Sequence, residues 1–237
     1  MRQFLISLIL GTLSLTPVAL ASERIVLIEL FTSQGCNSCP PADEILRDIS
    51  DTHDDVLALS LHVDYWDYLG WKDIFAQPQF KSRQAAYNEQ IKSRYSLVTP
   101  QIVFDGQAQV AGGHTIKIFE AMNVARAGQD RAALNLVATQ MGLRAEITPM
   151  QGSRAADVYL VRFTQSEDVA IAAGENGGKK LTYTNVVKEW TKIGEWDGTS
   201  EARFSADIAG DDKTAVIVQV AGSGPVLAAR KLQFAGN

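Results

Sequence analysis

The sequence predicts a mixed α/β domain followed by a β-rich, sandwich-like part. Three observations lead to this prediction. Strand-like apolar runs alternate with helical segments up to about residue 127, only short alternating runs follow, and a Cys-x-x-Cys pair separates the first strand from the first helix. Strands that alternate with helices are typical of a parallel sheet, whereas many short strands separated by turns favour a sandwich. The 237 residues can form one large or two small domains.

The first part has the element order β-α-β-α-β-β-α. The expected elements are, in order, a strand at 24–31, a helix ending at residue 50, a strand at 56–63, a helix within 79–95, strands at 101–104 and 107–111, and a helix at 115–127. Helical crossovers predict parallel pairing on one side of the sheet. The Asp105-Gly106 turn predicts an antiparallel pair on the other side. This order is the thioredoxin arrangement, which we expect to span residues 22–129.

The second part, residues 130–237, has no strong helical period. Its alternating apolar runs lie at 134–139, 143–147, 158–164, 203–208, 215–220 and 227–234. Turn signals separate these runs, as expected of a β-rich, sandwich-like domain. No low-complexity linker precedes this part, so we expect the two parts to pack together.

The N-terminus predicts an exported protein. Arg2 supplies a positive charge, an apolar run extends from Phe4 to Leu20, and Ala19-Leu20-Ala21 is a small-x-small cleavage site. This pattern is typical of a secretory signal peptide, here residues 1–21, and the alternative is an uncleaved membrane anchor. Cleavage leaves 237 − 21 = 216 residues and, by removing Arg2, changes the net charge from −5 to −6. We therefore expect a periplasmic or secreted protein.

Charge and hydropathy narrow the range of partners. The mature chain is acidic and has no basic run, which argues against nucleic acid or an anionic membrane surface as a partner. After the signal peptide, no run approaches the roughly 20 apolar residues that span a bilayer, so we expect no membrane association after cleavage. The sequence does not indicate an oligomeric state.

The two cysteines, Cys36 and Cys39, are three residues apart. In an exported protein a cysteine pair usually forms a disulfide. A four-residue loop contributes only ~2 kcal/mol to stability on the loop-entropy formula, against ~4.7 kcal/mol for a 100-residue loop. The pair is therefore a weak staple, and its position between a strand and a helix suits a redox couple better.

The residues around the pair favour thiolate chemistry. Ser38 is the expected N-cap of the helix, and Pro40 and Pro41 are tolerated in a first turn whose N–H groups have no helical partner. Those N–H groups and the helix dipole favour the thiolate, which is the species that attacks a disulfide. We expect Cys36 to be the more exposed nucleophile and Cys39 the resolving thiol. The alternative is a structural or metal-binding pair.

A proline before the third strand gives a second indication. Val98-Thr99-Pro100 ends the second helical segment and opens that strand. In thioredoxin-like folds a cis-proline at this place lies against the Cys-x-x-Cys pair. We therefore expect a cis Thr99-Pro100 bond and expect both residues to shape a substrate groove. The alternative is a trans proline that begins an edge strand.

Five segments carry a family resemblance. They are ELFTSQGCNSCPPAD at 29–43, HVDYWDYLGWKD at 62–73, TPQIVFDG at 99–106, GENGGKKLTYTN at 174–185 and GEWDG at 194–198. These segments resemble the DUF1223 family of bacterial secreted, thioredoxin-like proteins. The resemblance covers nearly the whole mature chain and implies a thioredoxin-like domain with a β-rich C-terminal part. It implies no particular substrate.

Three other residues could change the reactivity of the cysteines or bind a metal ion with them. Glu29 interrupts an apolar strand and could shuttle the proton of the resolving thiol; alternatively it faces outward or pairs with a lysine. His62 could tune a thiolate or join the cysteines around copper or zinc, with His114 as a further ligand. A structural histidine is the alternative, and no metal site or cofactor is assigned.

Two loops have a distinctive composition. The aromatic loop contains Tyr65, Trp66, Tyr68 and Trp71, and we expect it to fold inward as a small core with an exposed rim, although it could form a wall for a partner. The segment 174–180 is glycine-rich but lacks the phosphate-loop pattern, so we interpret it as a flexible hairpin.

Three functions remain compatible with these patterns. The first is a thiol–disulfide oxidoreductase that acts on protein thiols or disulfides through Cys36 and Cys39. The second is a copper- or zinc-handling module that uses the cysteines and His62. The third is a protein-binding module in which the β-rich half recognises a partner and the cysteines are a minor staple.

Overall fold

The computed structural model describes residues 24–208 and 210–233. The helices are α1 (Pro40–Thr52), α2 (Pro78–Gln90), α3 (Thr115–Arg126) and the short 3-10 helix η1 (Asp67–Leu69). The strands are β1 (Val26–Thr32), β2 (Val56–His62), β3 (Gln101–Phe104), β4 (Ala108–Ala111), β5 (Ala132–Thr139), β6 (Gly142–Pro149), β7 (Ala156–Ala170), β8 (Lys180–Trp196), β9 (Ala202–Asp207), β10 (Lys213–Gln219) and β11 (Val226–Lys231). The predicted signal peptide, residues 1–21, lies outside the described residues. Within them, no helix is both long and apolar enough to cross a bilayer.

The first part has the predicted element order and pairing. It contributes four neighbouring strands to an eight-stranded sheet of order β11-β10-β7-β8-β2-β1-β3-β4. β1 and β2 are parallel, in a register that places Val26 opposite Val56. β3 runs antiparallel to β1, and β3 pairs with β4 through the hairpin at Asp105-Gly106.

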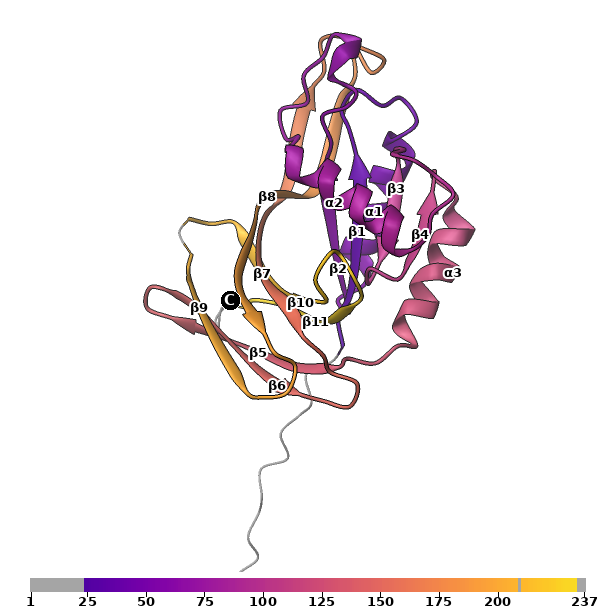
Figure 1. Ribbon diagram of the computed structural model, residues 1–237. Coiled ribbons are helices and arrows are strands. Elements are labelled where there is room, and N and C mark those ends of the chain that lie inside the picture. Colours follow the sequence, from indigo (N-terminus) through magenta and orange to yellow (C-terminus); the bar gives the residue numbers. More distant parts are fainter. Residues whose placement is uncertain (1–23, 209, 234–237) are drawn as a thin grey trace, which may run out of the picture.

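Helices cover both faces of this part of the sheet. α1 and α3 pack on one face through a cluster that includes Leu46 and Ile118, whereas α2 packs on the other through Phe80 and Tyr87. Every residue of β1 and β2 is buried, as expected of parallel strands covered on both sides. In Figure 1 these elements form the upper right of the molecule.

The second part continues the same sheet. β8 lies parallel to β2, with Ser60 opposite Val186, so the sheet crosses the boundary expected between residues 129 and 130. The three-stranded sheet β5-β6-β9 packs against the lower part of the large sheet around Leu143, Val158 and Val216. The mixed α/β class and the two packed β layers are as predicted. The division into two folding units stays a prediction.

The β7–β8 hairpin is the main difference from the expected elements. β8 was not predicted as a strand, and β7 extends beyond the expected run at 158–164. The pairing of β7 with β8 shifts register between Val158 and Tyr159 and again between Arg162 and Phe163. Each shift adds a residue to one strand, so the two-residue alternation that reveals a strand is interrupted. The hairpin rises along the sheet to the level of η1 (Figure 1), and we call residues 171–179 the hairpin tip.

Candidate functional site

Cys36 and Cys39 lie in the loop between β1 and α1. The N–H of Cys36 donates to the carbonyl of Ser33, and the N–H of Cys39 donates to the carbonyl of Cys36. α1 then begins at Pro40, with prolines in its first two positions as expected. Cys39, not Ser38, is the N-cap, and it makes no side-chain capping bond. The prediction for Ser38 was therefore wrong, and its hydroxyl serves another contact described below.

The two cysteines form a disulfide with Cα atoms 5.5 Å apart. Both residues are buried, with exposed fractions of 1% for Cys36 and 0% for Cys39. The expectation that Cys36 is the more exposed sulfur is not met in this conformation. Its position before the helix would leave it exposed in isolation, but segments distant in the sequence pack against the loop.

The aromatic loop is the first of these segments. A Cβ added at Gly35 would lie 3.0 Å from the Cβ of Trp66, so this side chain touches the cysteine loop directly. The indole of Trp66 donates to Thr99 Oγ1 at 2.7 Å, and the indole of Trp71 donates to Gln34 Oε1 at 2.8 Å. The expected exposed rim is Tyr68, which is 77% exposed and stacks on the Trp66 ring.

The hairpin tip is the second segment. Asn176 is fully buried although its neighbours are exposed. Its Nδ2 donates to the carbonyls of Gln34 at 3.0 Å and Cys36 at 2.9 Å, while its Oδ1 accepts from Lys179 at 2.9 Å. The segment interpreted from the sequence as a flexible hairpin is therefore fixed against the cysteine loop. An asparagine among glycines is typical of any turn, so the sequence carried no signal for this contact.

Removing the Asn176 amide is expected to open the site. Asn176→Ala loses the two hydrogen bonds to the cysteine loop, each worth about 1 kcal/mol, so we expect the disulfide to be reduced by dithiothreitol up to about 30-fold faster. Glu175→Ala is the matched control, because among the described residues Glu175 makes a single exposed hydrogen bond, which it accepts from the Asn37 N–H at 3.3 Å. Equal reduction rates in the wild type and Asn176→Ala would mean that the hairpin tip does not limit access.

Thr99 and Pro100 lie beside the same loop. Their peptide bond is cis, as predicted. The Ser38 hydroxyl donates to the Thr99 carbonyl at 3.5 Å and lies 3.4 Å from the Sγ of Cys36. The structure thus brings the predicted groove residues together with the cysteines. Their role in substrate binding stays a prediction.

Glu29 is buried on β1 and pairs with an arginine, not with the lysine considered as an alternative. Arg83 Nε donates to Oε1 at 2.6 Å, and Arg83 Nη2 donates to Oε2 at 3.1 Å. The Tyr87 hydroxyl also donates to this carboxylate, and Gln219 of β10 accepts from Arg83 at 2.8 Å. Both oxygens of Glu29 are thus committed to a structural network, which leaves them poorly placed for proton shuttling.

A second buried carboxylate, Asp73, holds His62. Nδ1 of His62 and Oδ2 of Asp73 share a hydrogen bond of 2.8 Å, and both side chains are fully buried. Burial alone would raise the pKa of Asp73. The His62 ring and the N–H donors of Gln34 and Phe75 outweigh burial and lower that pKa below its usual value. His62 is therefore held by an ionised carboxylate through its Nδ1 proton.

Asp43 is a candidate that the sequence analysis missed. It lies on α1 one helical turn after Cys39, and its side chain is buried. No hydrogen bond of ordinary geometry reaches either carboxylate oxygen within residues 24–208 and 210–233. Burial raises the pKa of Asp43 to about 7, against a lesser opposing effect of His62. Only the four-residue spacing from Cys39 could have indicated it.

The residues of the metal hypothesis do not gather. Across the described part of the chain, no group of three or more histidine, cysteine, aspartate or glutamate side chains is arranged to hold a metal ion. His62 is engaged by Asp73, while His114 lies before α3 in a different pocket. The structure therefore does not assemble Cys36, Cys39 and His62 as ligands.

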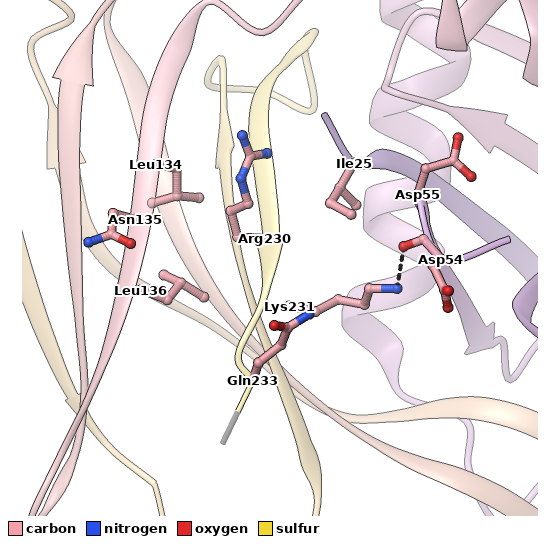
Figure 2. Close-up of a pocket in the computed structure, with 9 residues that line it drawn as sticks. All are labelled: Ile25, Asp54, Asp55, Leu134, Asn135, Leu136, Arg230, Lys231 and Gln233. Atoms are coloured by element: carbon pink, nitrogen blue, oxygen red, sulfur yellow. Dashed lines mark hydrogen bonds between the residues drawn. The ribbon is translucent and has the colours of Figure 1, made fainter. Parts of the chain in front are cut away.

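An open pocket of about 680 Å³ lies at the opposite end of the sheet (Figure 2). It adjoins Ile25 and Asp55, which precede β1 and β2, whereas the cysteines follow β1. Figure 2 shows Lys231 turned to Asp54, and its Nζ donates to the Asp54 carbonyl at 2.7 Å. Arg230 pairs with Asp130 at 2.8 Å. The lining cations already have partners, so the disulfide is the stronger candidate site.

The fold and the site define a mixed α/β protein with a buried Cys-x-x-Cys disulfide at a strand-to-helix turn. The chain belongs to the DUF1223 family, described as "Protein of unknown function", which matches residues 27–221. The crystal structure of a protein from Agrobacterium tumefaciens is similar, with 30% sequence identity and a TM-score of 0.75 over 92% of this chain and 100% of that one. The family resemblance seen in the sequence is confirmed.

A more distant likeness concerns the fold alone. HBP35 of Porphyromonas gingivalis has 14% sequence identity and a TM-score of 0.53, over 89% of this chain and 75% of that one. No curated protein matches the chain significantly.

Proposed function

We propose that this protein is an exported thiol–disulfide oxidoreductase on a thioredoxin-like scaffold. It acts in the periplasm or outside the cell on protein thiols or disulfides and needs no bound cofactor. The observation that carries the proposal is the Cys36–Cys39 disulfide at the start of α1 beside the cis Thr99-Pro100 bond. A disulfide between cysteines three residues apart adds little to stability, because the loop that it closes is short. The same short spacing suits thiol–disulfide exchange, because the second cysteine lies close enough to attack a mixed disulfide on the first.

The chemistry is a two-step exchange. A substrate thiolate attacks the Sγ of Cys36, the Cys36–Cys39 bond breaks, and Cys39 leaves as a thiolate. A second substrate thiolate then attacks the mixed disulfide, so the substrate gains a disulfide and the protein holds two thiols. Two electrons pass from the substrate to the cysteine pair. The same steps in reverse reduce a substrate disulfide.

Asp43 is the group best placed to exchange a proton with Cys39. It lies one turn further along the same helix, both residues are buried, and the Glu29 oxygens are taken by Arg83 and Tyr87. A carboxyl group with a pKa of about 7 can give up and take back a proton near neutral pH. We therefore assign the proton-exchange role to Asp43 in place of Glu29.

Trapping tests the function directly. Cys39→Ala is expected to accumulate mixed disulfides between Cys36 and partner proteins in cells that export it, because the resolving thiol is absent. These adducts should run as slower bands on non-reducing gels and disappear on reduction. The matched control is the double variant Cys36→Ala/Cys39→Ala, which should form none. Recovery of no adduct from Cys39→Ala would contradict the proposal.

A further inference from the structure

A groove crosses the free edge of the large sheet. β4 is the last strand in the sheet order and, among the described strands, pairs only with β3. An open pocket of about 420 Å³ lies there, lined by β4, by the segment 91–95 after α2 and by the first turn of α3. Because α2 and α3 cover opposite faces of the sheet, the groove extends around the β4 edge from one face to the other. Figure 1 shows β4 at this margin beside α3.

The lining of the groove is cationic. Lys92, Arg94 and Lys117 line it, His114 adds a fourth basic group, and none of the described residues that line it carries a carboxylate. All three cations are exposed, and within the described residues none has a carboxylate partner. Arg94 is held in place by Tyr95, whose hydroxyl accepts from Nη2 at 3.0 Å. On a chain of net charge −5, a groove with three unpaired cations is suited to an anionic ligand.

The groove leads to the cysteine loop. Beyond β4, the N–H of Gly112 donates to the carbonyl of Pro100 at 2.8 Å. A Cβ added at Gly113 would lie 3.6 Å from the Cβ of Pro41, two residues after Cys39. A chain lying along β4 would therefore continue toward the disulfide through the cis-proline turn.

We propose that this groove binds an acidic, extended stretch of polypeptide that belongs to the substrate of the cysteine pair. Its backbone pairs with the free N–H and C=O groups of β4, as extended peptides do at open sheet edges. Its carboxylates pair with Lys92, Arg94 and Lys117. The identification of this peptide as substrate rests on the proposed function, whereas binding itself does not need the cysteines.

The test measures binding without exchange. A fluorescently labelled, capped, cysteine-free peptide rich in glutamate is titrated with the full-length protein, beside a counterpart in which glutamine replaces glutamate. We expect the triple variant Lys92→Gln/Arg94→Gln/Lys117→Gln to raise the Kd at least about tenfold, and added salt to weaken binding to the wild type. The control Lys81→Gln/Arg131→Gln/Arg154→Gln removes the same charge from exposed positions elsewhere and should leave the Kd unchanged. Thermal unfolding of both variants checks that they fold.

Three results would overturn the proposal. Equal affinity for the glutamine peptide would exclude carboxylate recognition. Equal losses in the two triple variants would mean that only net charge matters. If inorganic phosphate binds with the same variant dependence and the acidic peptide binds no more tightly than phosphate, the groove is a small-anion site. The peptide has no cysteine, so its binding does not depend on thiol exchange. If the peptide binds but Cys39→Ala traps no partner in cells, the proposed exchange function is contradicted and the proposed binding groove is not.

Discussion

Arg83→Met is expected to lower the free energy of unfolding by about 3–5 kcal/mol, because it leaves the buried Glu29 carboxylate without its counter-charge. Methionine keeps most of the side-chain volume, so the loss reports the charge and not a cavity. Urea denaturation followed by circular dichroism measures the effect at constant m-value.

The size of this effect follows from how many elements the arginine connects. It makes two hydrogen bonds to Glu29 on β1, at 2.6 and 3.1 Å, and one to Tyr87 within α2, at 2.7 Å. It also donates to Gln219 of β10 at 2.8 Å, and its guanidinium lies 3.9 Å from the centre of the Trp190 ring on β8. The network thus joins the first part of the chain to the β-rich part, and we expect both to unfold together.

Two comparisons isolate the cause. The double variant Glu29→Leu/Arg83→Met removes both charges and should recover much of the loss, because a buried ion pair often exchanges for apolar residues at little cost. Arg126→Met breaks the partly exposed pair with Asp55 and should cost no more than about 1 kcal/mol. A loss below about 1 kcal/mol in Arg83→Met would mean that solvent reaches Glu29.

The local elements of the site were predictable because neighbouring residues determine them. The strand that ends at Thr32, the turn and the helix after the cysteines follow from apolar patterning and helix-start rules, although those rules placed the N-cap at Ser38, one residue before Cys39. The cis bond before Pro100 followed from its place in the element order. Glu29 was correctly singled out as an acid in a buried strand, but its partner, 54 residues away, was not predicted.

The cover of the site was not predictable because it depends on distant contacts. Asn176 meets the carbonyl of Cys36 across 140 residues of sequence, and no local pattern distinguishes it from an ordinary turn asparagine. The same holds for the burial of Cys36, which local reasoning treats as exposed. The sequence predicts the position of the two sulfurs in the fold, whereas long-range packing determines whether solvent or a substrate can reach them.

Asp43→Asn is expected to make the oxidised protein more stable than the wild type above pH 7. The folded-state pKa of about 7 exceeds the ordinary value of 3.8, so the folded state binds a proton that the unfolded state has released. Below about pH 4 both states are protonated and the group has no effect. Between about pH 4 and pH 7 the free energy of unfolding falls by up to about 1.36 kcal/mol for each pH unit. Above about pH 7 the ionised Asp43 therefore lowers the free energy of unfolding by about 4 kcal/mol in total.

Denaturation at pH 4 and pH 8 measures this effect. Asparagine cannot ionise, so the difference in unfolding free energy between the variant and the wild type should be up to about 4 kcal/mol larger at pH 8 than at pH 4. Glu44→Gln, the exposed neighbour on α1, is the matched control and should stay within about 0.5 kcal/mol at both values. Parallel pH profiles for Asp43→Asn and the wild type would mean that Asp43 is hydrated.

The same substitution links stability to chemistry. Asparagine has nearly the same shape as aspartate and could fill the same space without the cost of a buried charge. Because the Asp43 carboxyl group lowers stability near neutral pH and lies one turn from Cys39, its presence favours a role in proton exchange. The rate at which Cys39 leaves in thiol exchange should then lose its dependence on a group of pKa about 7 in Asp43→Asn. A purely structural Asp43 would change stability and leave the pH profile of exchange where it was.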